Sequence, residues 1–213
     1  MDTKDLGLIE YTAYLTLQNE LLNNRRAGTV NDTLILAEHP SVITFGKLAQ
    51  GEGFKDKEYF NRERVSFVNT TRGGKITYHG PGQLMIYPII DLKALKKDIT
   101  RYIKFLENAV IAGLKSFDII GETLEGRHGV WVDKKKIAFI GVAVKEWVTY
   151  HGVSVNINND ITAFTKIIPC GENDITATSA KEIKGYALNF EAVKKIFQER
   201  FIEEFERTYV KHI

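Results

Sequence analysis

The sequence has very little cysteine: Cys170 is the single one among 213 residues. A lone cysteine cannot form an intramolecular disulfide, which excludes the disulfide-rich secreted domains. The N-terminus MDTKDLGLIE also lacks the apolar run that a secretory signal requires. Together these absences predict a protein of the reducing cytoplasm.

Long hydrophobic runs and an excess of one charge are absent as well. A membrane-spanning helix needs about 18 uninterrupted apolar residues, whereas the richest stretch, 84–90, is of strand length and contains Pro88. The net charge of +2 is far from the strongly basic surface expected of a nucleic-acid-binding domain. We therefore expect neither a membrane nor a nucleic acid as partner.

What is present is the composition of a globular protein, with 44% hydrophobic and 26% charged residues. Without any linker of low complexity, we expect one domain over residues 1–213, and a monomer is the simplest assembly. The apolar residues recur with helical spacing in three segments and with strand-like character in several others. The helices are expected at 11–27, from Asp98 to 114 and at 190–209, and the strands at 33–37, 42–45, 65–68, within 72–90, and at 129–132, 137–144 and 147–156.

Between these segments, residues 47–61 show no periodicity and predict a surface loop. Helices and strands do not alternate strictly, as they would in a βαβ protein. The predicted fold class is therefore α+β, with a mixed, largely antiparallel sheet packed by helices.

Four glycines lie within eleven residues, in Arg72-Gly73-Gly74 and in Gly80-Pro81-Gly82. Glycine lets backbone N–H groups approach a ligand closely, so these segments either cradle an acyl carbonyl or a phosphate, or are simply two tight turns. The sequence contains neither G-x-x-x-x-G-K-[ST] nor G-x-G-x-x-G, and nucleotide binding has no positive signal.

Cys170 lies in Ile168-Pro169-Cys170-Gly171, where a proline and a glycine leave space around the sulfur. It is either a nucleophile or a small buried hydrophobe. His79 and His151 both follow Thr-Tyr and precede glycine, an echo that would place two imidazoles at neighbouring strand ends. One cysteine and no His-x-x-Glu-His spacing leave a zinc site without enough ligands, and no cofactor is expected.

Three lysines, Lys134 to Lys136, form a basic turn before an apolar strand. The last of them opens the strand, and its ammonium could be held at the sheet rather than in water. A partly desolvated lysine can exchange protons near neutrality, and beside a thiol it would favour the thiolate, which attacks carbonyl carbon. Spacing alone does not show that Lys136 and Cys170 meet.

Taken together, four segments in this order and spacing resemble the lipoyl(octanoyl) transferases. They are RGGKITYHGPGQ at 72–83, GVWVDKKKIAFIGVAV at 129–144, TYHGVSVNINND at 149–160 and FTKIIPCG at 164–171. Glu38-His39-Pro40 followed by VITFG also looks like the N-terminal signature of that family. The resemblance implies the fold of the catalytic domain of biotin and lipoate protein ligases.

The resemblance further implies a reaction and its residues. An octanoyl group would be taken from octanoyl-acyl carrier protein and placed on a lysine of lipoyl domains, those of 2-oxoacid dehydrogenase complexes and the glycine cleavage H protein. Cys170 matches the nucleophile of the family, and Lys136 matches the lysine that tunes its ionisation and shuttles protons. The segments matched to the acyl site contain Arg72, Gly73, Gly74, Lys75, Ile76, Thr77, Tyr78, His79, Phe139, Ile140, Gly141, Gly152, Val153 and Ser154.

Two residues of these segments depart from the family pattern. Phe139 stands where a small residue is usual, and Ser154 where alanine is usual; both lie in the acyl-site segments, so they bear on the preferred acyl chain rather than on the reaction. Two other functions remain open: an ATP-dependent lipoate or biotin ligase, which needs no cysteine, and a non-catalytic module that binds acyl carrier protein.

Overall fold

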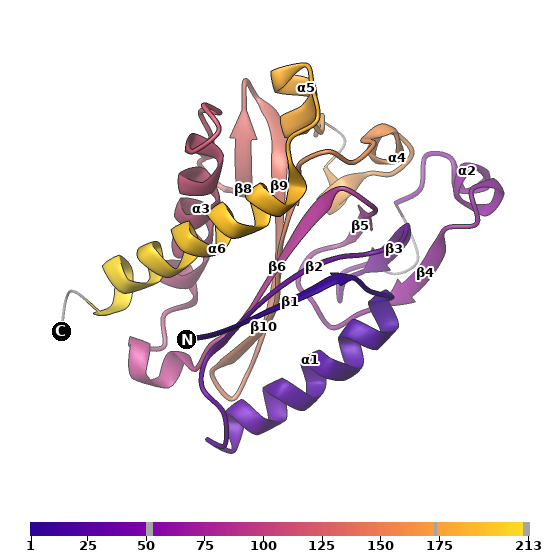
Figure 1. The fold of residues 1–213 in the computed structure, drawn as a ribbon. Coiled ribbons are helices and arrows are strands. Elements are labelled where there is room, and N and C mark those ends of the chain that lie inside the picture. Colours follow the sequence, from indigo (N-terminus) through magenta and orange to yellow (C-terminus); the bar gives the residue numbers. More distant parts are fainter. Residues whose placement is uncertain (50–52, 173, 211–213) are drawn as a thin grey trace.

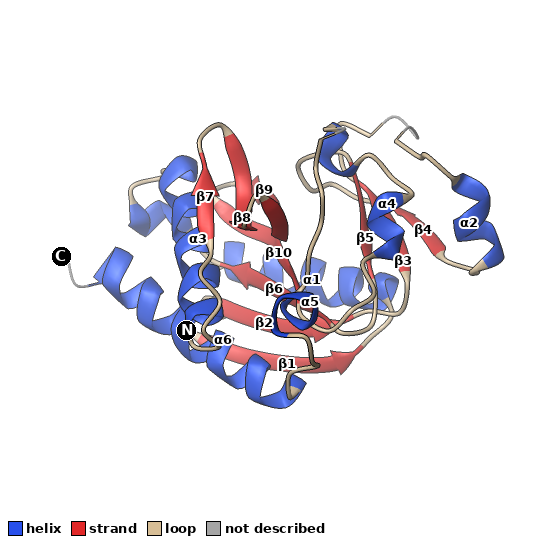
Figure 2. Ribbon diagram, turned by 90° about the horizontal axis from the view of Figure 1, so that it is seen from above, coloured by secondary structure: helices blue, strands red, loops and turns tan. Residues whose placement is uncertain are grey.

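A computed structural model of the protein describes residues 1–49, 53–172 and 174–210, with the side chains of Ala94 and Cys170 outside that description. Two sheets stand side by side, a large one flanked by the long helices and a small one beside it (Figures 1 and 2). The predicted α+β class is confirmed, including the largely antiparallel pairing.

The large sheet has seven strands in the order β1-β2-β6-β10-β9-β8-β7. Only β1 and β2 run parallel, and every other neighbouring pair is antiparallel. Their bounds are β1 (Asp2–Leu8), β2 (Thr33–Glu38), β6 (Gln83–Ile89), β7 (Glu122–Leu124), β8 (Arg127–Val132), β9 (Lys135–Lys145) and β10 (Val148–Asn156).

Two of the hairpins in this sheet have two-residue turns in which both residues have positive φ. Asp133 and Lys134 have φ of 48° and 63° between β8 and β9, and Glu146 and Trp147 have φ of 50° and 68° between β9 and β10. Turns of this kind match the right-handed twist of the strands that they connect. The turn at 133–134 fixes where β9, the strand of Lys136, begins.

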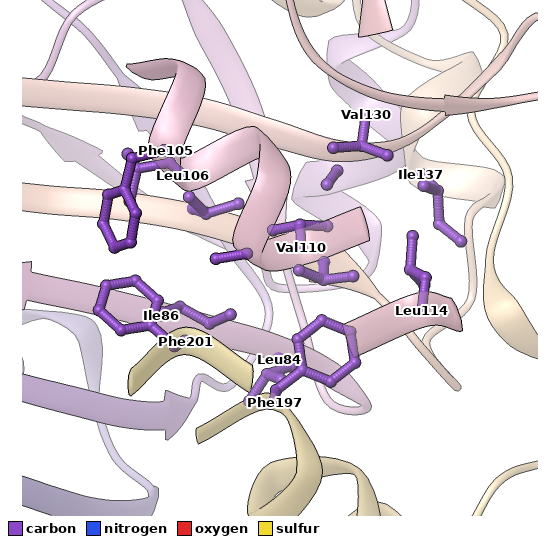
Figure 3. Close-up of a cluster of buried hydrophobic side chains, with 14 of the residues drawn as sticks. Leu84, Ile86, Phe105, Leu106, Val110, Leu114, Val130, Ile137, Phe197 and Phe201 are labelled. Carbon is purple, nitrogen blue, oxygen red and sulfur yellow. The ribbon is translucent and has the colours of Figure 1, made fainter. Parts of the chain in front are cut away.

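One face of the large sheet is covered by α3 (Ile99–Lys115) and α6 (Phe190–Phe205). Asp98 and Asn189 cap these helices by accepting hydrogen bonds from backbone N–H groups. Figure 3 shows Phe197 and Phe201 of α6 beside the side chains of α3 and of the sheet. Burial of these large apolar side chains supplies most of the driving force for folding.

The other face of the large sheet carries α1 (Tyr11–Arg26) at one end. Beyond α1 lies the small sheet, in the order β4-β3-β5, formed by β3 (Val42–Phe45), β4 (Ser66–Asn69) and β5 (Ile76–His79). Its apolar side chains pack with Trp131, Phe139 and Phe164. In this cluster the small sheet packs, through β3 and β5, against β8 and β9 of the large sheet.

Several short elements complete the chain. They are α2 (Lys57–Arg62), α4 (Thr162–Thr165), α5 (Ala180–Lys184), the 3-10 helices η1 (Leu92–Leu95) and η2 (Pro169–Gly171), and the π-helical η3 (Glu206–Val210). The predicted loop at 47–61 is wrong at its end, because Asp56 accepts a hydrogen bond from the Tyr59 N–H and starts α2. The long predicted helices and the central strands are confirmed within a few residues.

Candidate active site

A pocket lies between the two sheets. Its floor is a row of side chains across three strands of the large sheet: Phe139 of β9 pairs with Ser154 of β10, which pairs with Met85 of β6. Side chains opposite one another in neighbouring strands point to the same face. The row therefore presents a mainly apolar surface to the pocket.

The pocket gathers nearly all the residues that the sequence assigned to an acyl site, from three separate segments of the chain. They are Arg72, Gly73, Gly74, Lys75, Ile76, Thr77, His79, Phe139, Ile140, Gly141, Gly152, Val153 and Ser154. Tyr78 is the exception: its hydroxyl is 3.0 Å from the Ser41 hydroxyl and its ring packs on Phe164. Because residues alternate along β5, Tyr78 points away from its neighbours Thr77 and His79.

The two glycine-rich segments have different roles. Gly73 and Gly74 line the pocket, and a Cβ on the facing Gly46 would lie 2.3 Å from the Gly74 carbonyl oxygen. Gly82, by contrast, has a φ of +83° in a tight turn packed on the backbone of Asn159. The first segment belongs to the site, and the second segment is a turn.

Four further residues line the pocket that the sequence reasoning did not place there: Tyr11, Met85, Tyr87 and His151. Met85 and Tyr87 are two residues apart in β6, so their side chains point to the same face of the sheet. Once that face is known to border the pocket, the strand period indicates both residues. His151 was marked by its Thr-Tyr-His-Gly context. Tyr11 comes from α1, far away in sequence, and nothing in its own segment signals the site.

Arg72 is the buried cation of the pocket, with 7% of its surface exposed. Its guanidinium donates to the Thr44 backbone oxygen at 2.6 Å, to the Thr44 hydroxyl at 2.9 and 3.1 Å, and to the Gly73 carbonyl at 3.0 Å. These bonds fasten the Gly73-Gly74 segment to β3. They keep a positive charge beside the pocket wall.

Three imidazoles are buried around the pocket. Burial lowers the pKa of His39 to about 4 and that of His151 to about 3, in the second case with help from the positive charge of Arg72. Burial also holds the pKa of His79 well below its usual value. All three are therefore neutral at pH 7, and protonation of any of them would place a charge in the interior.

Lys136 is almost completely buried, with 2% of its surface exposed. Its Nζ lies 5.1 Å from the centres of the Trp131 and Phe139 rings, a distance at which an ammonium is attracted to an aromatic face. Its backbone pairs with the segment 176–178, through Lys136 N–H to Thr176 O at 2.8 Å and Thr178 N–H to Lys136 O at 3.0 Å. The side chain is held at the sheet.

A β-bulge aims Lys136 toward these rings. Val130 pairs with Ala138, but the next residue of β8, Trp131, pairs with Lys136, so that Ile137 is an extra residue in β9. A bulge of this kind shifts the alternation of the strand. Lys136 and Phe139, which regular alternation would send to opposite faces, thereby both reach the side of the small sheet.

Cys170 lies in η2, and its side chain is outside the described part of the structure. The backbone of η2 contacts β5, a strand that lines the pocket. The following Gly171 has a φ of +77°, and a Cβ there would lie 2.4 Å from the Lys75 side chain. The short helix thus lies beside the pocket, with glycine required where Lys75 crosses it.

Among residues 1–49, 53–172 and 174–210, no three His, Cys, Asp or Glu side chains gather as a metal ion would need. Within the same part of the chain, none of the helices has both the length and the apolar character for a membrane crossing.

Comparison with known proteins agrees with this geometry. The family model "Lipoyl protein ligase A/B catalytic domain" matches residues 10–202. A lipoate protein ligase from Thermoplasma acidophilum superposes with a TM-score of 0.73 at 15% identity, covering 97% of this chain and 83% of that one. A biotin protein ligase from Aquifex aeolicus gives 0.63 at 14% identity, covering 99% and 72%. The fold is that of a lipoate or biotin protein ligase catalytic domain.

Sequence similarity narrows the class. An octanoyltransferase from Solibacter usitatus is 39% identical over 207 residues, which cover 97% of this chain and 91% of that protein. The chain belongs to the octanoyltransferase family within the lipoyl protein ligase A/B group, and it is an acyltransferase.

Proposed function

We propose that the protein transfers an octanoyl group from octanoyl-acyl carrier protein to a lysine of lipoyl domains, the first step of protein lipoylation. The observation that carries this proposal is the apolar pocket between the sheets, which gathers the three segments matched to an acyl site beside the backbone of Cys170. The floor row of Phe139, Ser154 and Met85 suits an alkyl chain. The acceptors are the lipoyl domains of 2-oxoacid dehydrogenase complexes and the glycine cleavage H protein.

The reaction proceeds in two steps through a covalent intermediate. The Cys170 thiolate attacks the thioester carbonyl, the C–S bond to the carrier breaks, and the carrier thiol leaves with a proton. The lysine amine of the acceptor then attacks the Cys170 thioester, releases the thiolate and gives up a proton. Covalent catalysis lets the two protein substrates visit in turn.

Lys136 manages these protons in the proposed mechanism. Its side chain is buried against Trp131 and Phe139. In the proposed mechanism it takes the thiol proton and returns it to the leaving thiol. Main-chain amides of the matched acyl-site segments stabilise the tetrahedral oxyanion, each such donor contributing about 3 kcal/mol in well-studied enzymes. The Gly73 N–H is not one of them, because it donates to the Val142 carbonyl at 2.9 Å.

The acidic carrier protein would meet a basic surface near the pocket. Four lysines, Lys134, Lys135, Lys145 and Lys166, could supply that surface, but Lys135 and Lys145 are the two ends of β9, roughly 33 Å apart at 3.3 Å per residue. Lys166 forms an ion pair with Asp56 at 3.4 Å. The docking surface therefore centres on Lys134 and Lys135, beside Lys136.

We further propose that the 213 residues act as one catalytic domain, as a monomer and in the cytoplasm. A nucleophilic thiol needs a reducing compartment to stay available.

Intact-mass measurement after mixing with octanoyl-acyl carrier protein tests the proposal. The wild type should gain one octanoyl group, bound as a thioester. Cys170→Ser, which has no thiol, should gain no octanoyl group. Lys136→Ala should fold normally and lose at least about 100-fold in transfer rate, whereas Lys145→Ala, at the other end of β9, keeps the wild-type rate. An adduct that survives in Cys170→Ser would contradict the proposal.

The ligase alternative makes a different demand. An ATP-dependent ligase would acylate a lipoyl domain only with ATP and a free acid, and its activity would survive loss of the cysteine. Transfer from octanoyl-acyl carrier protein without ATP, abolished in Cys170→Ser, separates the two activities. A non-catalytic carrier-binding module would show neither.

A further inference from the structure

A chain of buried polar side chains runs through the protein from Arg72, at the pocket, toward the strand segment that holds Lys136. Its members are almost fully buried: Thr44 and Gln83 are 0% exposed, His79 is 5% exposed, Asn156 is 0% exposed and Thr178 is 2% exposed. Buried polar groups are costly unless they are paired. Each of these residues forms a hydrogen bond with the next one in space, in an order that differs from their order along the polypeptide.

The links of this chain are all of hydrogen-bond length. The Thr44 hydroxyl lies 3.3 Å from His79 Nε2, and His79 Nδ1 lies 2.9 Å from Gln83 Oε1. Gln83 Nε2 lies 2.8 Å from Asn156 Oδ1, and Asn156 Nδ2 lies 2.9 Å from the Thr178 carbonyl oxygen. The Thr178 N–H then donates to the Lys136 carbonyl at 3.0 Å.

The two ends of the chain fix the direction of every bond between them. The Thr178 carbonyl can only accept, so Asn156 must present its NH2 group there and its oxygen to Gln83. Gln83 therefore donates to Asn156 and offers its own oxygen to His79, whose Nδ1 must carry the proton. At the other end the Arg72 guanidinium can only donate to the Thr44 oxygen, which leaves the Thr44 hydrogen for His79 Nε2.

All donors thus point the same way, from the pocket cation to the backbone beside Lys136. A chain of hydrogen bonds with one direction polarises its members cooperatively, and a reversal of any member would oppose two donors or two acceptors. The turn at 80–82 brings Gln83 back over His79, and it is held by Gly82 N–H donating to Glu38 Oε2 at 2.7 Å. The Asn159 amide adds a second donor to Asn156 Oδ1 at 3.1 Å.

We propose that Gln83 and Asn156 are positioning residues for acyl transfer: they hold His79 in the tautomer with the proton on Nδ1 and fasten the 176–178 segment that pairs with Lys136. Neither residue lines the pocket, so they act through His79 and through the backbone of Lys136. The kinetic part of this inference rests on the proposed function, while the tautomer does not.

Nitrogen-15 NMR of the imidazole side chains tests the tautomer directly in the wild-type protein. At pH 7 His79 should show a protonated Nδ1 and an unprotonated Nε2. In Gln83→Met, which removes the acceptor while keeping the length of the side chain, the proton should shift toward Nε2. A wild-type His79 that carries its proton on Nε2, or on both nitrogens, would overturn the proposed direction of the chain.

Kinetics test the positioning role. Gln83→Met and Asn156→Asp should each lower kcat for octanoyl transfer by about 10- to 100-fold with little change in KM for the donor, because neither residue touches the acyl chain. The double variant should lose less than the product of the single effects, since both act in one chain. Gln198→Met and Asn31→Asp, which make the same changes outside the chain, serve as matched controls and should keep the wild-type kcat.

The outcomes distinguish this inference from the proposed function. If the wild type forms no octanoyl adduct, the proposed function fails, and the tautomer measurement still decides the direction of the chain. If the wild type is active and folded Gln83→Met and Asn156→Asp both retain its kcat, the positioning role is wrong. If the two variants do not fold, the wild-type tautomer alone decides: Nε2 protonation overturns the proposal, and Nδ1 protonation supports it.

Discussion

Phe139 is the residue at which pocket, lysine and core meet. Its ring lines the pocket, stacks on Phe164 with a centre-to-centre distance of 4.8 Å, and lies 5.1 Å from Lys136 Nζ. A ring in that place both limits the pocket and covers the lysine. Phe139 therefore belongs both to the pocket lining and to the apolar core.

Phe139→Ala should therefore open the pocket toward longer acyl chains. Each further methylene that is buried contributes about 0.8 kcal/mol, or about fourfold in kcat/KM, so decanoyl, with two more methylenes, should gain over octanoyl by roughly fifteenfold. Competition between acyl-carrier substrates, read by mass spectrometry, measures this ratio. Phe164→Leu is the control, because it removes the same stack without changing the pocket lining; an unchanged preference in Phe139→Ala would show that the ring does not limit the chain.

The buried histidines make stability depend on pH. His39 is fully buried, donates from Nδ1 to the Ile9 carbonyl and accepts from the Tyr87 hydroxyl at Nε2, and burial lowers its pKa from 6.5 to about 4. Below pH 6.5 the His39 imidazole binds a proton in the unfolded chain but not in the folded protein. The free energy of unfolding therefore falls as the pH falls from about 6.5 to 4. From pH 7 to pH 5, His39 alone costs about 2 kcal/mol.

Urea unfolding of His39→Gln at the two pH values measures this contribution. The variant should be less stable than the wild type at pH 7, yet lose about 2 kcal/mol less between pH 7 and pH 5. His128→Gln, at an exposed position of β8, should leave the pH dependence as it is. Parallel pH curves for His39→Gln and the wild type would contradict the buried neutral state.

At this scale the sequence predicted much of the pocket, because Arg72, His79, Phe139 and Ser154 lie in segments whose motifs are local. It could not predict Tyr11, which reaches the pocket only because α1 packs on the sheet. Nor could it show that Gln83 and Asn156 meet, since their contact depends on the pairing of β6 with β10.

Among the elements, β9 shows how local geometry places the side chain of Lys136, the lysine of the proposed mechanism. A two-residue turn with positive φ starts the strand, and the bulge at Ile137 turns Lys136 toward the aromatic rings. Gly129, with a φ of +127°, leaves room for the lysine, because a Cβ there would lie 2.5 Å from Lys136 Cε. The strand and the turn could be predicted from the sequence. The bulge could not, because it depends on pairing with β8 and does not show in the alternation of side chains along β9.

The packing of α3 on α6 depends on a glycine. A Cβ on Gly113 would lie 2.7 Å from the Phe197 ring. Gly113→Ala gains up to about 1 kcal/mol in helix propensity, but overpacking costs about 1–3 kcal/mol. We therefore expect a net loss of stability of about 1 kcal/mol in urea unfolding. In a Phe197→Leu background the same change should become neutral or stabilising; an equal loss in both backgrounds would show that the ring is not the cause.

The missed elements share a physical cause. β1 is exposed over most of its length and pairs in parallel with β2 only at the sheet edge, so it has no apolar alternation to find. β7 has three residues, too few for a period, and α2 is specified chiefly by its Asp56 cap. The long helices and central strands were predicted because burial imposes a period on their sequences.

On the scale of the whole molecule, charge should govern the encounter with the proposed donor, an acidic acyl carrier protein. Lys134→Glu with Lys135→Glu should reduce kcat/KM for the donor by about tenfold at low salt, with the difference shrinking as salt screens the charges. Lys145→Glu makes the same kind of change at the far end of β9 and should have little effect. A salt-independent kcat/KM, or equal losses at both ends, would contradict docking beside Lys136.

The pocket lies between the two sheets and is lined by β5, β6, β9 and β10. The short helix η2 contacts β5 and so lies beside the pocket. This arrangement suits an enzyme that keeps an acyl chain between visits of two protein partners. A single-turnover chase observes that interval. The enzyme is acylated with octanoyl-acyl carrier protein, freed of the carrier, and then mixed with an unmodified lipoyl domain without ATP. We predict an octanoyl thioester on Cys170 that disappears at the rate at which the lipoyl domain gains the octanoyl group; transfer without any such thioester would contradict the covalent mechanism.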